Sequence, residues 1–154
     1  IGFPRVFQRG ILYILCNIFW EYTFSMKTIR YSQLVMPQDA NVFGTLFGGK
    51  MVSWMDISAS KAVHRFLKKS EADAALTRAI DAIEFKETVH VGDWVNFEAN
   101  IISTGKSSIV IKIDAYKESK EIDKTLACTA RFTFVSVKKD QFGTYKKINH
   151  NQTI

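Results

Sequence analysis

The residues with the clearest chemical potential lie between Asn41 and Asp56, in a run that contains two adjacent glycines. Residues 44–50 read GTLFGGK and match the pattern G-x-x-x-x-G-K of phosphate-binding loops. Two chemistries fit such a run. One is a loop that cradles a nucleotide phosphate, and the other is a helix start whose free N–H groups hold an oxyanion beside a carboxylate.

The flanking residues do not fit a phosphate-binding loop. Such a loop follows directly on a buried strand and has Ser or Thr after its lysine to bind magnesium. Here Pro37 and Asn41 interrupt the approach, and Met51 stands where the hydroxyl is required. The apolar run that ends at Asp114 alternates with polar residues, which is typical of a one-sided antiparallel sheet and not of a buried parallel one. We conclude that the match is a coincidence.

The alternative places Gly48 and Gly49 at the start of a helix. Without side chains there, a ligand can approach the unpaired N–H groups of the first turn closely. These donors and the helix dipole stabilise negative charge, such as the oxyanion that forms when a carbonyl is attacked. Asp56, two turns on, falls at the edge of the apolar stripe of this helix, where a carboxylate can act as a general base or a nucleophile. Taken alone, the helix pattern favours an aspartate that is solvated on the helix flank or satisfied locally over a catalytic one.

Hydrophobic periodicity predicts the elements that position these residues. Helical spacing from residue 47 to about 69 predicts one long helix, whose apolar stripe is Met51, Met55, Ala59, Ala62, Val63 and Phe66. Period-two alternation predicts five strands, at residues 29–35, 76–86, 95–101, 109–115 and 126–137. Short turns join neighbouring strands, as antiparallel pairing allows. The sequence therefore predicts an α+β domain in which one helix lies across a five-stranded antiparallel sheet.

Composition agrees with one soluble domain. The chain has 154 residues, of which 47% are apolar and 23% charged, so disordered and collagen-like classes are excluded. Cys16 and Cys128 form no C-x-x-C pair, and a reducing, cytoplasmic setting is expected. No metal site is expected, because none of the three histidines has ligand-type neighbours at metal spacing: His64, His90 and His150. The net charge of +6 fits nucleic acid, an anionic surface or a phosphate-bearing small ligand.

The two ends of the chain differ from its middle. Residues 1–25 contain the apolar run ILYILCNIFW, which is shorter than the roughly 20 residues of a membrane span. We interpret them as a non-domain leader that lies upstream of a natural start at Met26 or was added for expression. A membrane-associating leader is the alternative. Residues 26–139 are expected to form the domain, and residues 140–154 a polar, basic tail that is only partly ordered.

The run PQDANVFGTLFGGKMVSWMD resembles the signature of the hotdog-fold acyl-CoA thioesterases, and most of all their YciA-type and brain acyl-CoA hydrolase branch. The resemblance continues through residues 76–116 to CTARFTFVSV and covers nearly all of residues 26–139. It is specific because D-A-N, the glycine pair, M-D, V-G-D and G-x-x-S occur in this order. It implies a sheet wrapped around a central helix, and a homodimer with sites shared between protomers that assembles to a tetramer or hexamer.

The resemblance also implies a role for each matching residue. Asp56 matches the catalytic carboxylate, which activates water or attacks the thioester directly. Asn41 matches the polar residue that completes the site from the opposite protomer, and Gly48 and Gly49 match the helix start whose N–H groups hold the thioester oxygen. The residues expected to bind CoA are the turn Gly105, Lys106, Ser107 and Ser108, with Arg131, Lys138 and Lys139 as further basic contacts for the CoA phosphates.

The sequence therefore predicts a cytoplasmic acyl-CoA hydrolase of fatty acid metabolism, with CoA as part of its substrate and no separate cofactor. The main alternative is a non-catalytic acyl-CoA-binding module, such as a lipid-sensing regulator. A hotdog dehydratase is disfavoured because no histidine lies between Met26 and Asp56. Neither nucleic acid nor a membrane is an expected partner, since no aromatic–basic motif accompanies the positive charge.

Two departures from the family pattern affect the expected substrate preference. Glu87, Thr88 and His90 stand where relatives commonly have a proline ahead of V-G-D. Residues 57–59, Ile-Ser-Ala, replace small glycines after M-D. Both changes bear on acyl chain length more than on activity, the first at the substrate mouth and the second along the acyl tunnel.

Overall fold

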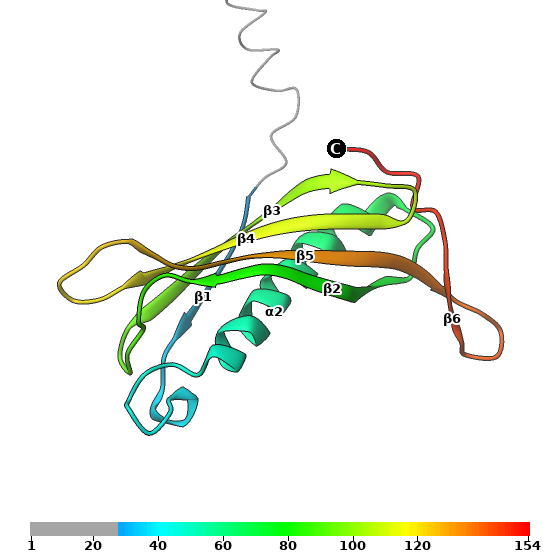
Figure 1. Cartoon of the computed structure of the whole chain (residues 1–154). Coiled ribbons are helices and arrows are strands. Elements are labelled where there is room, and N and C mark those ends of the chain that lie inside the picture. Colours follow the sequence, from blue (N-terminus) through cyan, green and yellow to red (C-terminus); the bar gives the residue numbers. More distant parts are fainter. Residues whose placement is uncertain (1–27) are drawn as a thin grey trace, which may run out of the picture.

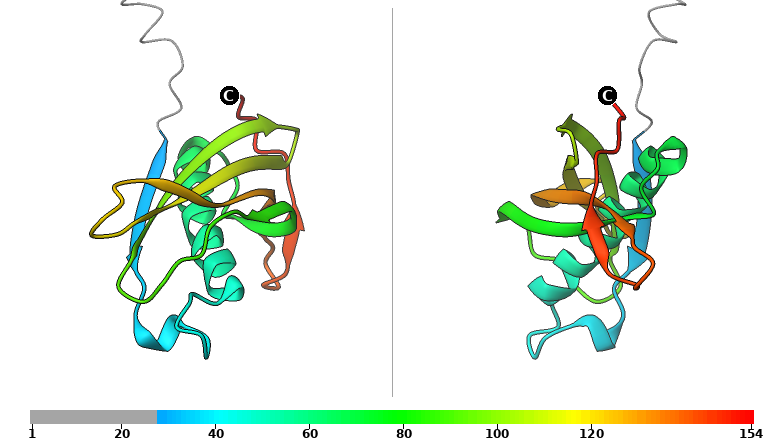
Figure 2. Two further views of the ribbon diagram at one scale, coloured as in Figure 1. Left: turned by 60° about the vertical axis from the view of Figure 1, so that its left-hand side comes forward. Right: turned by 90° about the vertical axis from the view of Figure 1, so that its right-hand side faces the viewer.

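The predicted strands lie in a single antiparallel sheet that curls around one long helix. The computed structural model describes residues 28–154, so the interpretation of residues 1–25 as a leader lies outside the described residues. The strands are β1 (Ile29–Leu34), β2 (Ala74–Phe85), β3 (Trp94–Thr104), β4 (Ser108–Glu118), β5 (Thr125–Lys139) and β6 (Tyr145–Lys147). Figure 1 shows the sheet arching over the helix, and the turned views of Figure 2 show its curl. This is the hotdog arrangement that the resemblance implies.

Strand order leaves β1 and β2 at the two ends of the main sheet. The order is β1-β3-β4-β5-β2, with the short β6 paired to the end of β5. All pairs are antiparallel; a short turn joins β3 to β4, and a longer connection, residues 86–93, carries the chain from β2 into β3. The register of β2 on β5 shifts twice, and Ala82, within the second shift, has a positive φ of 50°. Such bulges are frequent on edge strands.

Helix α2 (Gly48–Phe66) packs its apolar stripe against the inner face of the sheet. The stripe is buried as predicted, except that Phe66 at its end is only partly covered. Trp54 adds a further anchor, with its ring edge-on to Phe97 at 6.4 Å between centroids. A 3₁₀ turn, Leu67–Lys69, ends the helix. Among residues 28–154, no helix is long and apolar enough to cross a membrane.

The inner face of the sheet supplies the rest of the core. Alternate residues of β3, β4 and β5 are fully buried, including Phe97, Ile111 and Phe132. One predicted inward residue differs: Leu126 is only partly buried and Ala127 takes its place, because the register of β4 on β5 shifts beside it. Burial raises the pKa of the Cys128 thiol to about 11, which agrees with a packing role.

The C-terminal tail is more regular than the sequence predicts. After β5 the chain turns at Gly143 and returns as β6, whose residues pair with the end of β5. Beyond β6, Ile148 and His150 make further backbone hydrogen bonds, to Ser136 and Lys106. This strand was hard to predict because residues 145–147, Tyr-Lys-Lys, show no apolar alternation. The contacts that hold the tail are made by backbone groups, which leave no pattern in the sequence.

Candidate active site

Helix α2 begins at the glycine pair, as the sequence predicts. Gly48 is its first residue, the N-cap residue Phe47 offers no capping hydrogen bond, and the first turn contains no acidic residue. The first N–H groups of a helix have no partner within the helix. With no side-chain cap among the described residues, they are available to an oxygen atom that approaches from outside.

Lys50, the lysine of the glycine run, forms an ion pair within the chain. Its Nζ lies 3.2 Å from Oδ1 of Asp39, a carboxylate that is buried in the loop before the helix. Oδ2 of Asp39 accepts a hydrogen bond from the backbone N–H of Met36 at 3.1 Å. Lys50 therefore ties the loop to the helix, and its charge is engaged within the chain.

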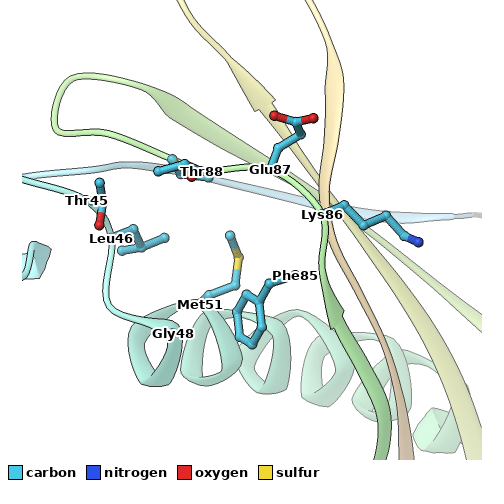
Figure 3. A pocket seen from close by; sticks show the side chains of 9 residues that line it. Thr45, Leu46, Gly48, Met51, Phe85, Lys86, Glu87 and Thr88 are labelled. Atoms are coloured by element: carbon cyan, nitrogen blue, oxygen red, sulfur yellow. The ribbon is translucent and has the colours of Figure 1, made fainter.

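A cavity of about 340 Å³ opens beside the helix start. Figure 3 shows Thr45, Leu46 and Gly48 on one side of it and the end of β2 on the other, with the ring of Phe85 standing over the helix. A Cβ atom on Gly48 would lie 3.2 Å from Cζ of Phe85, so the glycine allows this close approach. Glu87 and Thr88 line the same cavity.

Asn41 organises the loop that leads into this cavity. Its Oδ1 accepts hydrogen bonds from the backbone N–H of Phe43 at 2.9 Å and of Thr45 at 3.2 Å. Its Nδ2 donates to Oγ1 of Thr45 at 2.9 Å. Asn41 is thus held at the loop–helix junction, close to Gly48, and it makes no hydrogen bond to Asp56.

Asp56 lies two turns along α2, on the side that faces β2. It is partly exposed, and its Oδ1 accepts a hydrogen bond from Oγ1 of Thr77 at 2.8 Å. Thr77 is on the inner face of β2, opposite the buried Phe134 of β5. Thr77 belongs to no motif that marks it in the sequence. Alternation along β2 would have placed it on the inner face, but only the packing of strand against helix brings it to Asp56.

The predicted residues therefore fall into two separate groups within one chain. Asn41, Gly48 and Gly49 lie at the helix start, whereas Asp56 lies with Thr77. Seven residues separate Gly49 from Asp56, which at the helical rise is about 10 Å. One carbonyl group cannot touch both the first-turn N–H groups and the Asp56 carboxylate of the same helix.

The predicted CoA-binding turn lies at the opposite end of the sheet from the helix start. The turn is closed by a hydrogen bond from Gly105 N–H to the Ser108 carbonyl at 2.8 Å. Ser107 is buried, and its carbonyl accepts the N–H of Ser136, so Ser107 holds the turn to β5. Lys106 lines a hollow together with residues of the C-terminal tail.

The remaining predicted basic residues do not gather at this turn. Arg131 is exposed between the buried Ala130 and Phe132, so it lies on the outer face of β5. Lys138 is exposed near the end of the same strand, paired with Lys146 of β6. Seven strand residues separate Arg131 from Lys138, or about 23 Å. Their roles in CoA binding stay predictions, and the structure places Lys138 much nearer to the turn than Arg131.

A curled sheet around one helix, with an acidic residue on that helix and a glycine pair at its start, defines the hotdog class of proteins. Residues 43–124 match the family model described as the thioesterase superfamily. The chain belongs to this superfamily.

Similar proteins carry names that agree with this assignment. An uncharacterised acyl-CoA thioester hydrolase of Buchnera aphidicola subsp. Baizongia pistaciae is 36% identical over 117 residues, which cover 75% of this chain and 84% of that protein. A protein of the same description from Haemophilus influenzae is 34% identical over 109 residues and covers 68% of each chain.

Solved structures extend the comparison to three dimensions. The hexameric thioesterase y2039 of Yersinia pestis has a TM-score of 0.67 at 30% identity and covers 79% of this chain and 94% of its own. A hexameric broad-specificity acyl-coenzyme A thioesterase, solved as an aspartate-to-alanine mutant, has a TM-score of 0.64 at 28% identity, covering 82% of this chain and 89% of that one.

Proposed function

We propose that this protein hydrolyses the thioester of acyl-CoA to a free fatty acid and CoA. The observation that carries the proposal is the Asp56 carboxylate, held by Thr77 on the β2 side of the helix, in a chain of the thioesterase superfamily. The relatives named above are acyl-CoA thioester hydrolases, which supplies the substrate class.

The active site is shared between two copies of the chain. The separation of about 10 Å between the helix start and Asp56 supports a site that a second protomer completes. Two antiparallel helices, related by a twofold axis at the β2 edge, would bring the glycine pair of one copy to Asp56 of the other. The resemblance implies that Asn41 completes the site of the partner protomer. In this arrangement the glycine pair, which follows Asn41 at the start of the helix, would do so as well.

The β2 edge has the chemistry of an interface between copies. It ends the sheet, and several of its apolar side chains are exposed: Leu76, Ile80, Ile83 and Phe85. Ile57 of α2 is also about half exposed. An open edge with apolar side chains invites pairing with a second strand. The hexameric state of similar thioesterases supports a homodimer that assembles further.

The two groups of residues divide the chemistry of hydrolysis between them. In the general-base route, Asp56 takes a proton from a water molecule whose oxygen attacks the thioester carbon. The first-turn N–H groups of the partner's helix hold the carbonyl oxygen as negative charge develops on it. The C–S bond then breaks, and the CoA thiolate takes up the proton. Alternatively, Asp56 attacks the carbonyl carbon directly, the C–S bond breaks and CoA leaves as the thiolate, which takes up a proton; water then hydrolyses the mixed anhydride to the free acid and the Asp56 carboxylate.

Thr77 fits either route. Its hydroxyl donates to Oδ1 of Asp56, which fixes the rotation of the carboxylate and leaves Oδ2 for water or the thioester carbon. Thr77 is therefore proposed as a positioning residue of the site.

The test is the variant Asp56→Asn, which keeps the size and the acceptor oxygen of the side chain but removes the charge. Release of free thiol from butyryl-CoA should fall at least about a hundredfold, the typical effect of losing a general base. Binding of the substrate should be retained.

The matched control is Asp123→Asn, which removes one carboxylate in the exposed β4–β5 connection. It should hydrolyse butyryl-CoA at the normal rate. If Asp56→Asn does so too, Asp56 has no part in the reaction. If the unaltered protein binds acyl-CoA without releasing thiol, it is the non-catalytic binding module.

A further inference from the structure

Strands β5 and β6 are joined by a strongly basic hairpin. Residues 138–147, here called the basic hairpin, read KKDQFGTYKK and contain a single acidic residue. Figure 1 shows its turn projecting beyond the other strands at one end of the sheet. All of its lysines are exposed: Lys138, Lys139, Lys146 and Lys147. The positive charge of this segment is therefore presented to solvent.

Asp140 holds the turn of the basic hairpin. Its Oδ1 accepts hydrogen bonds from the backbone N–H groups of Phe142 and Thr144, each at 2.9 Å. The Asp140 N–H donates to the Thr144 carbonyl at 2.9 Å, and the Asp140 carbonyl accepts the N–H of Gly143 at 3.0 Å. Gly143 has a positive φ of 85°, which glycine adopts without strain. The backbone that carries Phe142 is therefore fixed at the tip.

Phe142 is an apolar side chain at a place where the fold does not bury it. It is 82% exposed and lies outside the hydrophobic core that the described residues form. Tyr145 on the returning strand is 49% exposed, and Nζ of Lys139 lies 5.9 Å from the centre of its ring. Transfer of an aromatic ring from water to an apolar phase is favourable. The tip of the hairpin therefore has an affinity for an apolar partner.

Lysines behind an exposed aromatic ring match the surface of an anionic lipid bilayer. Ammonium groups are attracted to negatively charged headgroups, and aromatic rings are stable at the boundary between headgroups and acyl chains. Lys138 pairs with Lys146 across the hairpin, and Lys139 pairs with Tyr145, so lysines lie on both faces. Every lysine of the hairpin is within three residues of the turn, or about 10 Å. The ammonium groups can therefore reach headgroups while Phe142 enters the bilayer.

Phosphate binding alone does not explain the tip. Nucleic acid and CoA both offer phosphates to lysine, but a phosphate gives no reason for an exposed phenylalanine. Single-stranded nucleic acid stacks successive bases on aromatic platforms in a basic groove, whereas Phe142 is one ring on a projecting turn. Lys146 and Lys147 are not among the residues expected to bind CoA. A bilayer accounts for the charge and the ring together.

We propose that the basic hairpin docks this protein on anionic lipid bilayers, with Phe142 at the headgroup boundary and the four lysines on the headgroups. The docking is peripheral and does not depend on thioester hydrolysis. It replaces the expectation from the sequence that no membrane is a partner, because the charge and the exposed ring come together only when β5 and β6 form the hairpin.

The test is cosedimentation with vesicles of phosphatidylcholine, with and without about one third phosphatidylglycerol. We expect binding to the anionic vesicles only, and its loss at high salt. The double variant Lys146→Gln, Lys147→Gln should bind them at least about tenfold more weakly, and Phe142→Ser about tenfold more weakly. Because these side chains are exposed, both variants should keep the urea midpoint and the rate of butyryl-CoA hydrolysis.

Matched controls lie in the β4–β5 connection, at the other end of β5. The double variant Lys120→Gln, Lys124→Gln also removes two lysines, one of them in an ion pair with Glu98 as Lys146 is with Asp140. Ile122→Ser removes one exposed apolar side chain. These controls should bind anionic vesicles as the unaltered protein does. A loss equal to that of the hairpin variants would mean that net charge and overall apolarity govern binding, and not the hairpin.

A tryptophan at the tip reports insertion directly. In Phe142→Trp, fluorescence emission should move to shorter wavelength when anionic vesicles are added, beyond any change in the three native tryptophans. If the lysine variant weakens binding but Phe142→Ser does not, and the emission stays constant, the hairpin is a general polyanion site and the bilayer proposal is wrong. Vesicle binding is measured without substrate, so its failure leaves the proposed hydrolysis standing, and a protein that binds vesicles but releases no thiol has lost only the proposed hydrolysis.

Discussion

The hydrogen bond from Thr77 to Asp56 gives the candidate catalytic carboxylate a defined orientation. Thr77 is exposed on β2, opposite the buried Phe134 of β5, and its hydroxyl is directed to the Asp56 carboxylate. A carboxylate held by one oxygen loses less entropy when it reaches the reactive geometry.

Replacement of Thr77 by valine tests this positioning role. Valine has the same shape but donates no hydrogen bond, so kcat for butyryl-CoA should fall about tenfold, or about 1.4 kcal/mol, within the range for a bond to a charged group. KM should change little because Thr77 acts on the carboxylate and not on the substrate. Thr77→Ser keeps the hydroxyl and should restore most of kcat. Equal activity of the two variants would mean that the hydroxyl does not matter.

At the level of elements, Gly49 is a glycine that its own chain does not require. It lies in the first turn of α2 with no positive φ, and a Cβ atom built on it meets nothing within 4 Å. Gly48, by contrast, has a reason within the chain, since Phe85 approaches it. A requirement for glycine at residue 49 would therefore come from outside the protomer, either from substrate or from a second copy.

The variant Gly49→Ala separates folding from function at the helix start. Alanine favours a helix over glycine by up to about 1 kcal/mol, so the urea midpoint should stay constant or rise. Thioester hydrolysis should nevertheless fall at least tenfold, because the added methyl group obstructs the approach of the carbonyl to the first-turn N–H groups. Ser53→Ala, at an exposed residue of the same helix, should leave both quantities close to normal. Full activity in Gly49→Ala would remove these N–H groups from the reaction.

The elements themselves were largely predictable because their patterns are dictated by burial. The stripe from Met51 to Val63 and the alternation of Ile109, Ile111 and Ile113 each require one buried face, and the structure confirms both. Leu126 was placed wrongly because a register shift depends on the neighbouring strand and leaves no mark on the strand's own sequence. Thr77 was missed for a similar reason, since its partner comes from another element.

The tail shows the limit of such patterns more clearly. His150 was considered only as a metal ligand, yet the structure buries it between α2 and the β3–β4 turn. A single histidine in a polar stretch carries no periodicity, so its burial follows only from the three-dimensional contacts of its two ring nitrogens.

At the scale of the whole molecule, the inner face of the sheet is wider than the helix that covers it. Ile80 and Phe85 of β2 point to the same face as the buried core residues opposite them, Phe132 and Cys128, yet both are substantially exposed. Helix α2 approaches Phe85 at Gly48 but leaves both side chains substantially exposed. The remaining apolar strip continues the core beyond the edge of one chain, and a second copy would complete it.

The variant Ile80→Lys tests whether the assembly and the active site depend on the same edge. Lysine places a charge in the proposed interface but leaves a single protomer intact, because Ile80 is already 38% exposed. The protein should therefore shift to a monomer in light-scattering measurements, and hydrolysis should fall by more than tenfold because each site needs the helix start of one copy and Asp56 of the other. Ile102→Lys makes the same change at an exposed residue of β3, away from this edge, and should alter neither property. A monomeric Ile80→Lys variant with full activity would show that one chain carries a complete site, which contradicts the separation of Gly49 and Asp56 along the helix.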